Sequence, residues 1–379
     1  MAAISKKKCL ILCYREPNLN GKGDQILTYK RIQYLKKTYK VSIITFSKNV
    51  NYIDPDLNYH RFNLPKLNYF KSALKFLLGK AIQSTLFDSQ EIRKFLKNNS
   101  NNFDLIIFIT QRMAHFKTKN NTRSIIEFID SQALNSNRRS KIEKNLLLKV
   151  FFFFESKFLI RYEKKLVKKF DKSIIISKVD KSFINDKELI VVPAGIELKS
   201  FKIKKNKKKS IVFSGNLSYF PNYSACLWFY NNCFVNLKKK YNDLEFLIVG
   251  RNPHSSLKNI SNRSGVSLFE NVDSVQDLIN QKAMLSVAPL FAGSGMQLKI
   301  LEAFNSLVPV ITTSIGNIPI SAIDNKEILI ANSANEFIEK VCLIIENNNF
   351  AKDLALNAKL FLKNNYSDEK VNELINEIY

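Results

Sequence analysis

Short apolar runs alternate with helical patterns along the whole chain, and this alternation constrains the fold more than any other feature. Alternation of this kind is typical of parallel sheets whose strands are joined by crossover helices. In the first half the strand-like runs are 9–14, 41–46, 105–110, 125–129 and 173–177. In the second half they are 210–214, 244–250, 266–269, 285–288, 308–312 and 328–331. The sequence therefore predicts two similar α/β units.

The boundary between the two units is predicted near residue 200. A chain of 379 residues exceeds what one hydrophobic core usually serves, and 45% apolar residues with few glycines and prolines favour packed domains. The segment 192–201, VPAGIELKSF, ends a strand, and the lysine-rich run after it should be solvated. We therefore predict domains at residues 1–200 and 201–379, with the last helix able to pack back on the first domain.

Charge is distributed very unevenly between these halves. Residues 1–209 hold 45 Lys and Arg against 17 Asp and Glu, whereas residues 210–379 hold 14 against 16. The basic half is expected to face an anionic surface or ligand. A lysine-rich genome composition is the competing explanation. Nucleic acid is not the expected partner, because the cations are not accompanied by an aromatic RNA-binding signature or a recognition helix.

The cysteines and the apolar runs limit the cellular location. Five cysteines are widely scattered, without the paired spacing of a zinc site or a disulfide framework, which fits a reducing compartment. No stretch reaches the ~18 to 20 apolar residues that a membrane-spanning helix requires. We expect a cytoplasmic protein that is soluble or lies on the inner face of the plasma membrane.

The most informative motif is GSGMQLKILEAFNSLVP, from Gly293 to Pro309. A glycine-rich turn after a strand opens a helix, and free amides at a helix start suit a phosphate. Lys299 and Glu302 then lie on one side of this helix, three residues apart. An ordinary strand-to-helix connection with a surface ion pair is the alternative.

Three further strand ends of the second half carry polar loops. They are Gly215-Asn216, Gly250-Arg251 and the segment from Asn271 to Ser274. Because open parallel sheets bind ligands at the carboxyl ends of their strands, one crevice could collect all four loops. This pattern favours a binding site over an ordinary set of connections.

With these motifs in place, the second half resembles the donor-binding domain of the family-4 class of retaining glycosyltransferases. That class has two facing Rossmann-like domains with parallel sheets, the GT-B architecture. The matching pieces are VPAGIE, IVFSGNLSYFPN, FLIVGRNP, SVAPLFAGSGMQLKILEAF and PVITTSIGN. The combination is similar to sugar transferases of bacterial polysaccharide assembly.

The resemblance implies roles for several residues. Glu302 would hold the nucleotide ribose, while Gly293, Ser294 and Gly295 with nearby cations would hold the diphosphate. The family's usual pattern has a second glutamate where this chain has Ser294, so backbone amides of the turn are expected to take its place. The family's common Arg and Lys after the first strand are also missing, so Lys299 and Arg251 would offset the charge of the leaving diphosphate.

In the first domain, Gly21, Lys22, Gly23 and Asp24 follow the first strand and open a helix running through Tyr34. By resemblance this loop, Gly23 included, faces the donor phosphates. A flexible turn with Asp24 as a helix cap is the alternative.

Another strand end carries QRMAHF, with Arg112 and His115. His115 falls where the family has active-site loop residues, so His115 and Lys299 are the catalytic candidates, although a lone histidine is more often structural. Asp130 ends the next strand and is expected either to orient the acceptor or to cap the helix after it. Asp24, Arg112 and Asp130 form the acceptor side.

The segment 141–169 is predicted to be one basic helix with four adjacent phenylalanines, Phe151 to Phe154. Part of it must pack inside, while its cations and aromatic residues fit an interfacial helix, so an anionic membrane is an expected partner. Asp54-Pro55-Asp56 resembles the metal site of another transferase architecture, but the predicted fold differs. We expect no metal and no cofactor beyond the nucleotide sugar.

The predicted function is the transfer of a sugar from a nucleotide-diphosphate donor to a glycan or lipid-linked acceptor, with retention of configuration. No enzymic nucleophile is then required, because orientation and fixed dipoles supply the catalysis. A nucleotide-sugar epimerase or a scaffold without turnover, which share the architecture, and a basic nucleic-acid-binding protein are the alternatives.

Overall fold

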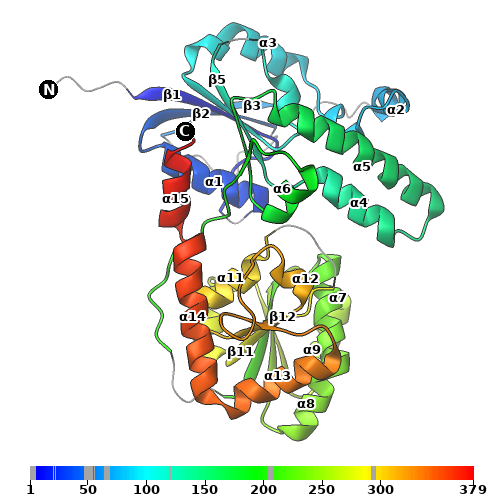
Figure 1. Ribbon diagram of the computed structural model, residues 1–379, viewed down its shortest axis with the longest axis vertical. Coiled ribbons are helices and arrows are strands. Elements are labelled where there is room, and N and C mark those ends of the chain that lie inside the picture. The colour runs from blue at the N-terminus through cyan, green and yellow to red at the C-terminus, as the bar shows by residue number, and fades with distance from the viewer. Residues whose placement is uncertain are drawn as a thin grey trace, which may run out of the picture. The chain divides into compact units, whose positions relative to one another are not determined.

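The computed structural model describes residues 6–19, 21, 23–46, 54, 56–63, 69–119, 121–203, 208–291 and 296–379. The chain forms two compact units, Met1–Pro193 with Ile378 and Ala194–Glu377 with Tyr379. Each unit has its own parallel sheet with helices around it (Figure 1). The α/β fold predicted from the alternation of strand-like runs and helical patterns is confirmed.

The first unit contains a seven-stranded sheet in the order β3-β2-β1-β4-β5-β6-β7. Its strands are β1 (Lys7–Cys13), β2 (Tyr39–Phe46), β3 (Asn58–Phe62), β4 (Leu105–Ile109), β5 (Arg123–Phe128), β6 (Lys172–Ile175) and β7 (Leu189–Val191). Its helices are α1 (Gly23–Leu35), α2 (Tyr69–Leu77), α3 (Gln90–Asn99), α4 (Gln132–Ile142), α5 (Leu146–Val167) and α6 (Lys178–Ile184), with the short helices η1 (Ile82–Ser84), η2 (Ser100–Asn102) and η3 (Ala114–Phe116). Strand β4 is apolar and buried throughout, and β1 is so after its first two lysines, as expected for a sheet covered on both faces.

The second unit contains a six-stranded parallel sheet in the order β10-β9-β8-β11-β12-β13. Its strands are β8 (Ser210–Asn216), β9 (Glu245–Arg251), β10 (Val266–Glu270), β11 (Leu285–Ala288), β12 (Val310–Thr312) and β13 (Leu329–Ile330). Its helices are α7 (Phe220–Phe229), α8 (Val235–Lys240), α9 (Ser255–Ser261), α10 (Val275–Lys282), α11 (Leu298–Asn305), α12 (Ser314–Asn317), α13 (Ala334–Glu346), α14 (Asn348–Tyr366) and α15 (Asp368–Asn376), with a π-helical turn (Tyr230–Phe234) between α7 and α8.

In both sheets the strand order reverses direction at one point. The first strand of unit 1, β1, pairs with β2 on one side and β4 on the other, and β8 pairs with β9 and β11 in the same way. Loops that leave the carboxyl ends on either side of such a point diverge and leave room for a ligand. The loops after β1 and β4, and those after β8 and β11, therefore hold the places where a site is expected in each unit.

The structure corrects one sequence prediction and adds one strand that was not predicted. The basic helix predicted at 141–169 is interrupted, because α4 ends at Ile142 and α5 begins at Leu146, where the Asn145 side chain caps the amide of Leu148. The edge strand β3 was not predicted, because none of its five side chains is fully buried and it lacks an apolar run.

Among the described residues, no helix is long and apolar enough to cross a membrane.

Candidate functional site

The carboxyl ends of β8 and β9 lie side by side in unit 2. Gly215 pairs with Gly250, and Asn216 pairs with Arg251. A Cβ atom at Gly250 would lie 1.9 Å from the Gly215 carbonyl oxygen, so only glycine fits at this close approach. Gly215 has φ +148°, which a side chain rarely allows. The two strand ends thus form a tight edge, beyond which the exposed side chains of Asn216 and Arg251 lie.

Lys299 reaches the same edge from α11. A Cβ atom on Gly215 would lie 3.4 Å from its Nζ atom, so a side chain at Gly215 would pack directly against this ammonium, and glycine leaves that space open. Nζ donates a hydrogen bond of 2.5 Å to Oδ1 of Asn222, and it lies 5.0 Å from the centre of the Phe213 ring. Asn222 is itself held by a 2.9 Å hydrogen bond from Nδ2 to the carbonyl oxygen of Asn216. The predicted residues Gly215, Asn216 and Lys299 are therefore brought together.

Burial makes the charged form of Lys299 unfavourable. The side chain is only 9% exposed, and burial lowers its pKa to about 8, against the opposing effect of Glu302. Within the part of the chain that the structure describes, Lys299 forms no ion pair at 4 Å or less. A buried cation whose ammonium contacts an amide oxygen and an aromatic ring is well placed to receive an anion.

Glu302 lies one turn further along α11. Its side chain is partly buried, and its carbonyl oxygen accepts hydrogen bonds from both the amide and the hydroxyl of Ser306. Its charge acts on Lys299, which places the two predicted residues within electrostatic range. The apolar residues Ile300, Ala303 and Phe304 of α11 are buried and anchor this helix in the core of unit 2.

Some of the predicted site residues lie outside the described residues, and one of the predicted polar loops has a structural role instead. Gly293, Ser294 and Gly295 lie outside the described residues, as does Lys22. In the third polar loop, Ser274 caps α10 and accepts a hydrogen bond of 2.9 Å from Lys199. Sequence reasoning did not single out Asn222, although it lies in the quoted run IVFSGNLSYFPN, because its role depends on a contact 77 residues away.

In unit 1, the loops after β1 and β4 bring together a second polar group. Arg15 donates hydrogen bonds of 3.0 Å to both carboxylate oxygens of Asp24. Burial lowers the pKa of Arg112, and its nearest charged neighbours include Arg15, Asp130 and Asp24. The predicted acceptor-side residues Asp24, Arg112 and Asp130 therefore share one electrostatic environment. Gly23 is exposed, and a Cβ atom added to it would meet nothing within 4 Å, so packing does not demand glycine there.

Arg112 and Asp130 are each positioned by neutral partners. Arg112 donates from Nε to Oε1 of Gln83 at 2.9 Å, and its guanidinium lies 5.3 Å from the Tyr14 ring centre. Asp130 accepts hydrogen bonds of 2.7 Å from the side-chain amides of Gln132 and Asn135. Burial raises the pKa of Asp130, while these hydrogen bonds and Arg112 oppose the rise. The cap of α4 is Ser131 rather than Asp130.

A buried carboxyl group, Glu163 of α5, hydrogen-bonds to residues next to Arg112 and Asp130. Its oxygens accept hydrogen bonds from Nε2 of Gln111 at 2.8 Å, from the Ser131 hydroxyl at 2.7 Å and from the Ala133 amide at 3.2 Å. Burial raises the pKa of Glu163 to about 7. Glu163 thus connects the loop after β4 to the start of α4. Its partner Gln111 directly precedes Arg112, and its partner Ser131 directly follows Asp130.

Backbone strain marks the same loop. Thr110, the residue after β4, has φ 69°, a left-handed conformation that costs a β-branched residue on the order of 1–3 kcal/mol. Its amide donates a 2.8 Å hydrogen bond to the Glu127 carbonyl, which holds this conformation in place. The turn directs the chain from the strand end into Gln111 and Arg112.

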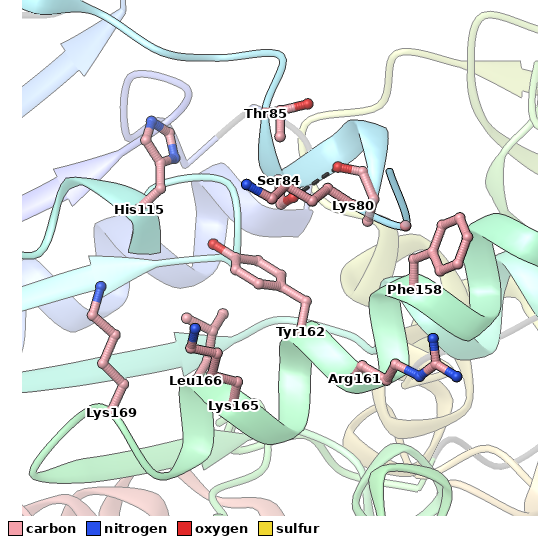
Figure 2. A pocket seen from close by; sticks show the side chains of 12 residues that line it. Lys80, Ser84, Thr85, His115, Phe158, Arg161, Tyr162, Lys165, Leu166 and Lys169 are labelled. Atoms are coloured by element: carbon pink, nitrogen blue, oxygen red, sulfur yellow. Dashed lines mark hydrogen bonds between the residues drawn. The ribbon is translucent and has the colours of Figure 1, made fainter. Parts of the chain in front are cut away.

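His115, the other catalytic candidate, lies in a different environment. It lines a cavity of about 480 Å³ between η1, η3 and α5 (Figure 2). Its Nε2 atom is 3.7 Å from Asp88, and neither ring nitrogen has a hydrogen-bond partner among the described residues. Burial lowers the pKa of His115 to about 4, so the imidazole is neutral at pH 7.

The aspartates rejected as a metal site are engaged by a lysine. Nζ of Lys36 lies 2.8 Å from Asp54 and 3.0 Å from Asp56. Pro55 lies outside the described residues.

Comparison with known proteins gives a family for part of the chain. Residues 208–347 match the family described as glycosyl transferases group 1. A Klebsiella pneumoniae protein described as an uncharacterized 44.6 kDa protein in the cps region is 25% identical over 244 residues. That match covers 60% of this chain and 61% of the relative, so it spans less than two thirds of the relative's length.

Solved structures resemble the chain over almost its full length. Sucrose-phosphate synthase from Thermosynechococcus elongatus has a TM-score of 0.72 at 13% identity, covering 99% of this chain and 98% of the other. The HepE protein of Anabaena, solved in complex with UDP-glucose, has a TM-score of 0.69 at 12% identity, covering 98% of each chain. At these identities the likeness concerns the fold, which is GT-B, as the sequence resemblance implied.

Proposed function

We propose that this chain, whose residues 208–347 belong to the glycosyl transferases group 1 family, transfers a sugar from a nucleotide-diphosphate donor to a glycan or lipid-linked acceptor with retention of configuration. The observation that carries the proposal is the buried cation of Lys299 beside the side-chain-free edge at Gly215. The HepE protein, which has a similar fold, was solved with UDP-glucose, and this supports a nucleotide sugar as the donor.

In this proposal the donor's diphosphate lies at the carboxyl ends of β8 and β11. The Lys299 ammonium neutralises charge that builds up as the diphosphate leaves, and Asn222 fixes the position of that ammonium. Gly293 to Gly295 lie outside the described residues, and their sequence motif predicts backbone amides for the same diphosphate, while Arg251 supplies a second cation. Glu302 binds the ribose through its carboxylate, a hydrogen bond to a charged group that is worth ~1.5 to 3 kcal/mol.

The acceptor is proposed to bind near Asp24, Arg112 and Asp130. Arg112 is suited to anchor an anionic part of the acceptor, because its guanidinium keeps its charge in a partly buried place. Asp130 is suited to receive a hydroxyl group, because its raised pKa brings the carboxyl closer to accepting a proton. The attacking hydroxyl would approach the face that the diphosphate leaves, so no covalent intermediate forms and orientation supplies much of the rate.

Attachment to an anionic membrane is proposed for unit 1. Large apolar side chains are exposed on α2 and the first turns of α5, and we call this set the α2–α5 apolar surface. It consists of Tyr69, Phe70, Leu74, Leu77, Leu78, Leu146, Leu147, Leu148, Val150, Phe153 and Phe154. The two helices pack together through Phe76, whose ring centre is 5.2 Å from those of Phe151 and Phe158. An exposed apolar set of this size, within a strongly basic half, fits an interfacial surface.

A vesicle experiment tests this attachment. The double variant Leu77→Ser, Leu147→Ser removes two of the most exposed apolar side chains, and we expect it to reduce co-flotation with vesicles containing phosphatidylglycerol at least fivefold. The matched control is Leu356→Ser, Leu360→Ser on α14, which should float like the wild type. Equal flotation of both double variants and the wild type would refute the attachment.

Incubation with a panel of nucleotide sugars tests the function itself. Release of a nucleoside diphosphate together with a new glycoside on a lipid-linked or glycan acceptor, with the anomeric configuration read by proton NMR, is the expected result. Conversion of the donor into another nucleotide sugar without release would instead identify an epimerase. Absence of any turnover with donors that bind would indicate a scaffold and contradict the proposal.

A further inference from the structure

The cavity that contains His115 is strongly basic and lies beside the α2–α5 apolar surface. Its walls come from the segment after α2, from η1, from η3 and from the second half of α5. Four of its lining side chains are cations, namely Lys80, Arg161, Lys165 and Lys169. None of the residues that line it, all from the described part of the chain, carries a carboxylate.

Lys169 lies close enough to other cations to be repelled by them. Burial lowers the pKa of Lys169, and the positive charges of Lys117, Lys165 and Arg93 lower it further. Asp88 is the acidic group that acts on His115, but it is engaged by Arg93 at 2.7 Å and lies half in solvent. Like charges gathered around an open volume, with little compensating charge, are stabilised by a bound anion.

His115 adds a directional donor to this cluster. Both of its ring nitrogens are buried, and neither forms a well-aligned hydrogen bond within the described part of the chain, although the Arg112 backbone lies near enough to act on the ring. Such burial is costly unless a ligand or water supplies a partner. In Figure 2 the ammonium of Lys169 and the hydroxyl of Tyr162 point toward the side of the cavity where His115 lies. A neutral imidazole offers one N–H, the Tyr162 hydroxyl is a second donor, and the Lys169 ammonium supplies charge, a combination that matches the oxygens of a phosphate group.

The apolar side of the cavity continues into the α2–α5 apolar surface. Phe158 lines the cavity and packs against both Phe76 and Phe154. Leu77 and Leu78, which are 81% and 78% exposed, directly precede the lining residues Gly79 and Lys80. A phosphate in the cavity would therefore have an apolar surface next to it.

We propose that this cavity is a phosphate-binding site, separate from the donor site in unit 2 and taking the phosphate of a lipid headgroup or free phosphate. It does not depend on sugar transfer, so it can hold even if the proposed function fails. The cavity volume of about 480 Å³ lies within the range of small-ligand pockets, so a phosphate group fits inside it.

The test is a calorimetric titration of the whole 379-residue chain, without any donor, using inorganic phosphate, decyl phosphate and the uncharged decyl maltoside. The variant Lys165→Gln, Lys169→Gln removes two lining cations. Its matched control, Lys164→Gln, Lys168→Gln, removes the same charge from neighbouring exposed residues that do not line the cavity. We expect the lining variant to bind phosphate at least tenfold more weakly than the wild type, and the control to change affinity less than threefold.

The two sources of phosphate are separated by the ligands. If the wild type binds decyl phosphate more tightly than inorganic phosphate, and Leu77→Ser, Leu78→Ser reduces this preference, the ligand is a lipid headgroup. Equal affinity for the two ligands supports free phosphate. The chain has three histidines, so the imidazole signals of His115 can be assigned in NMR spectra from its Gln variant, and phosphate should raise its pKa. Equal loss of affinity in the lining and control variants, or no binding of either phosphate by the wild type, would overturn the proposal.

Discussion

Nζ of Lys299 donates a 2.5 Å hydrogen bond to Oδ1 of Asn222, and the two residues come from α11 and α7, the helices that follow β11 and β8. The same Asn222 donates to the carbonyl oxygen of Asn216 at the end of β8. One amide side chain thus joins the predicted cation to the predicted strand end, and the first two predictions follow from this bond.

Substitution Asn222→Leu should destabilise unit 2. It leaves the buried Lys299 ammonium without its acceptor, which typically costs about 1–3 kcal/mol. Urea unfolding followed by the fluorescence of Trp228, the chain's one tryptophan, reports on this unit. The control Asn262→Leu changes an exposed amide at the end of α9 and should leave the unfolding free energy within about 0.5 kcal/mol. Equal stability of both variants would show that the bond contributes nothing.

Nucleotide binding should weaken as the pH rises above 8. Burial lowers the pKa of Lys299 to about 8, so the fraction of free protein that carries the cation falls about tenfold between pH 7 and pH 9. A bound diphosphate requires that cation, so affinity should fall by about the same factor. Calorimetry of the wild type and Lys299→Met at both pH values checks this, because the wild-type affinity should approach that of the variant as the pH rises from 7 to 9. A constant ratio of their affinities across this range would contradict the role of Lys299.

The stability of unit 1 should decrease as the pH rises from about 4.5 to 7 through Glu163. Burial raises its pKa from 4.5 to about 7, so in this window the folded state holds a proton that the unfolded chain has released. The unfolded state therefore binds fewer protons, and the free energy of unfolding falls with rising pH, by about 3 kcal/mol in all. Below pH 4.5 the contribution is complete, and above pH 7 it has been lost.

Thermal unfolding followed by circular dichroism at pH 5.0 and pH 7.5 measures this effect. Relative to Glu163→Gln, which cannot ionise, the wild type should lose stability between the two pH values. Glu143→Gln, at the end of α4, should follow the wild type. Parallel pH dependence of the wild type and Glu163→Gln would show that Glu163 titrates normally.

Chelation of divalent metals should leave transfer unaffected. In the proposed mechanism Lys299 and the amides of the glycine-rich turn neutralise the leaving diphosphate, so no metal ion is needed for that charge. We expect the initial rate of donor consumption to be the same with and without EDTA, once added magnesium has been dialysed away. A loss of rate that manganese or magnesium restores would refute this prediction.

Much of the fold could be predicted from the sequence, because buried parallel strands leave a strong local signal. The runs that became β1, β2, β4 and β8 to β11 are apolar, and an α-helix directly follows β1 and each of β8 to β11. Edge strand β3 leaves no such signal, since its side chains stay partly exposed. The break between α4 and α5 depends on one capping side chain, Asn145, inside a segment whose composition is helical throughout.

The candidate site was predicted only where local motifs mark it. Gly215, Asn216 and Lys299 lie in recognisable segments, and parallel strands bring their carboxyl ends to one edge. Asn222 and Glu163 could not be found in this way, because their roles depend on contacts with residues far along the chain. The basic cavity at His115 has the same origin, since η1, η3 and α5 assemble it from three separate segments.

The central claim is that unit 2 holds a nucleoside diphosphate through Lys299 and Glu302. The most direct test is a thermal-shift screen of nucleoside diphosphates, followed by calorimetry with the one that stabilises the protein most. We predict that Lys299→Met weakens binding at least tenfold, that Glu302→Ala costs ~1.5 to 3 kcal/mol, and that the exposed Lys258→Met binds like the wild type. Unchanged binding in both Lys299→Met and Glu302→Ala, or no binding of any nucleoside diphosphate by the wild type, would contradict it.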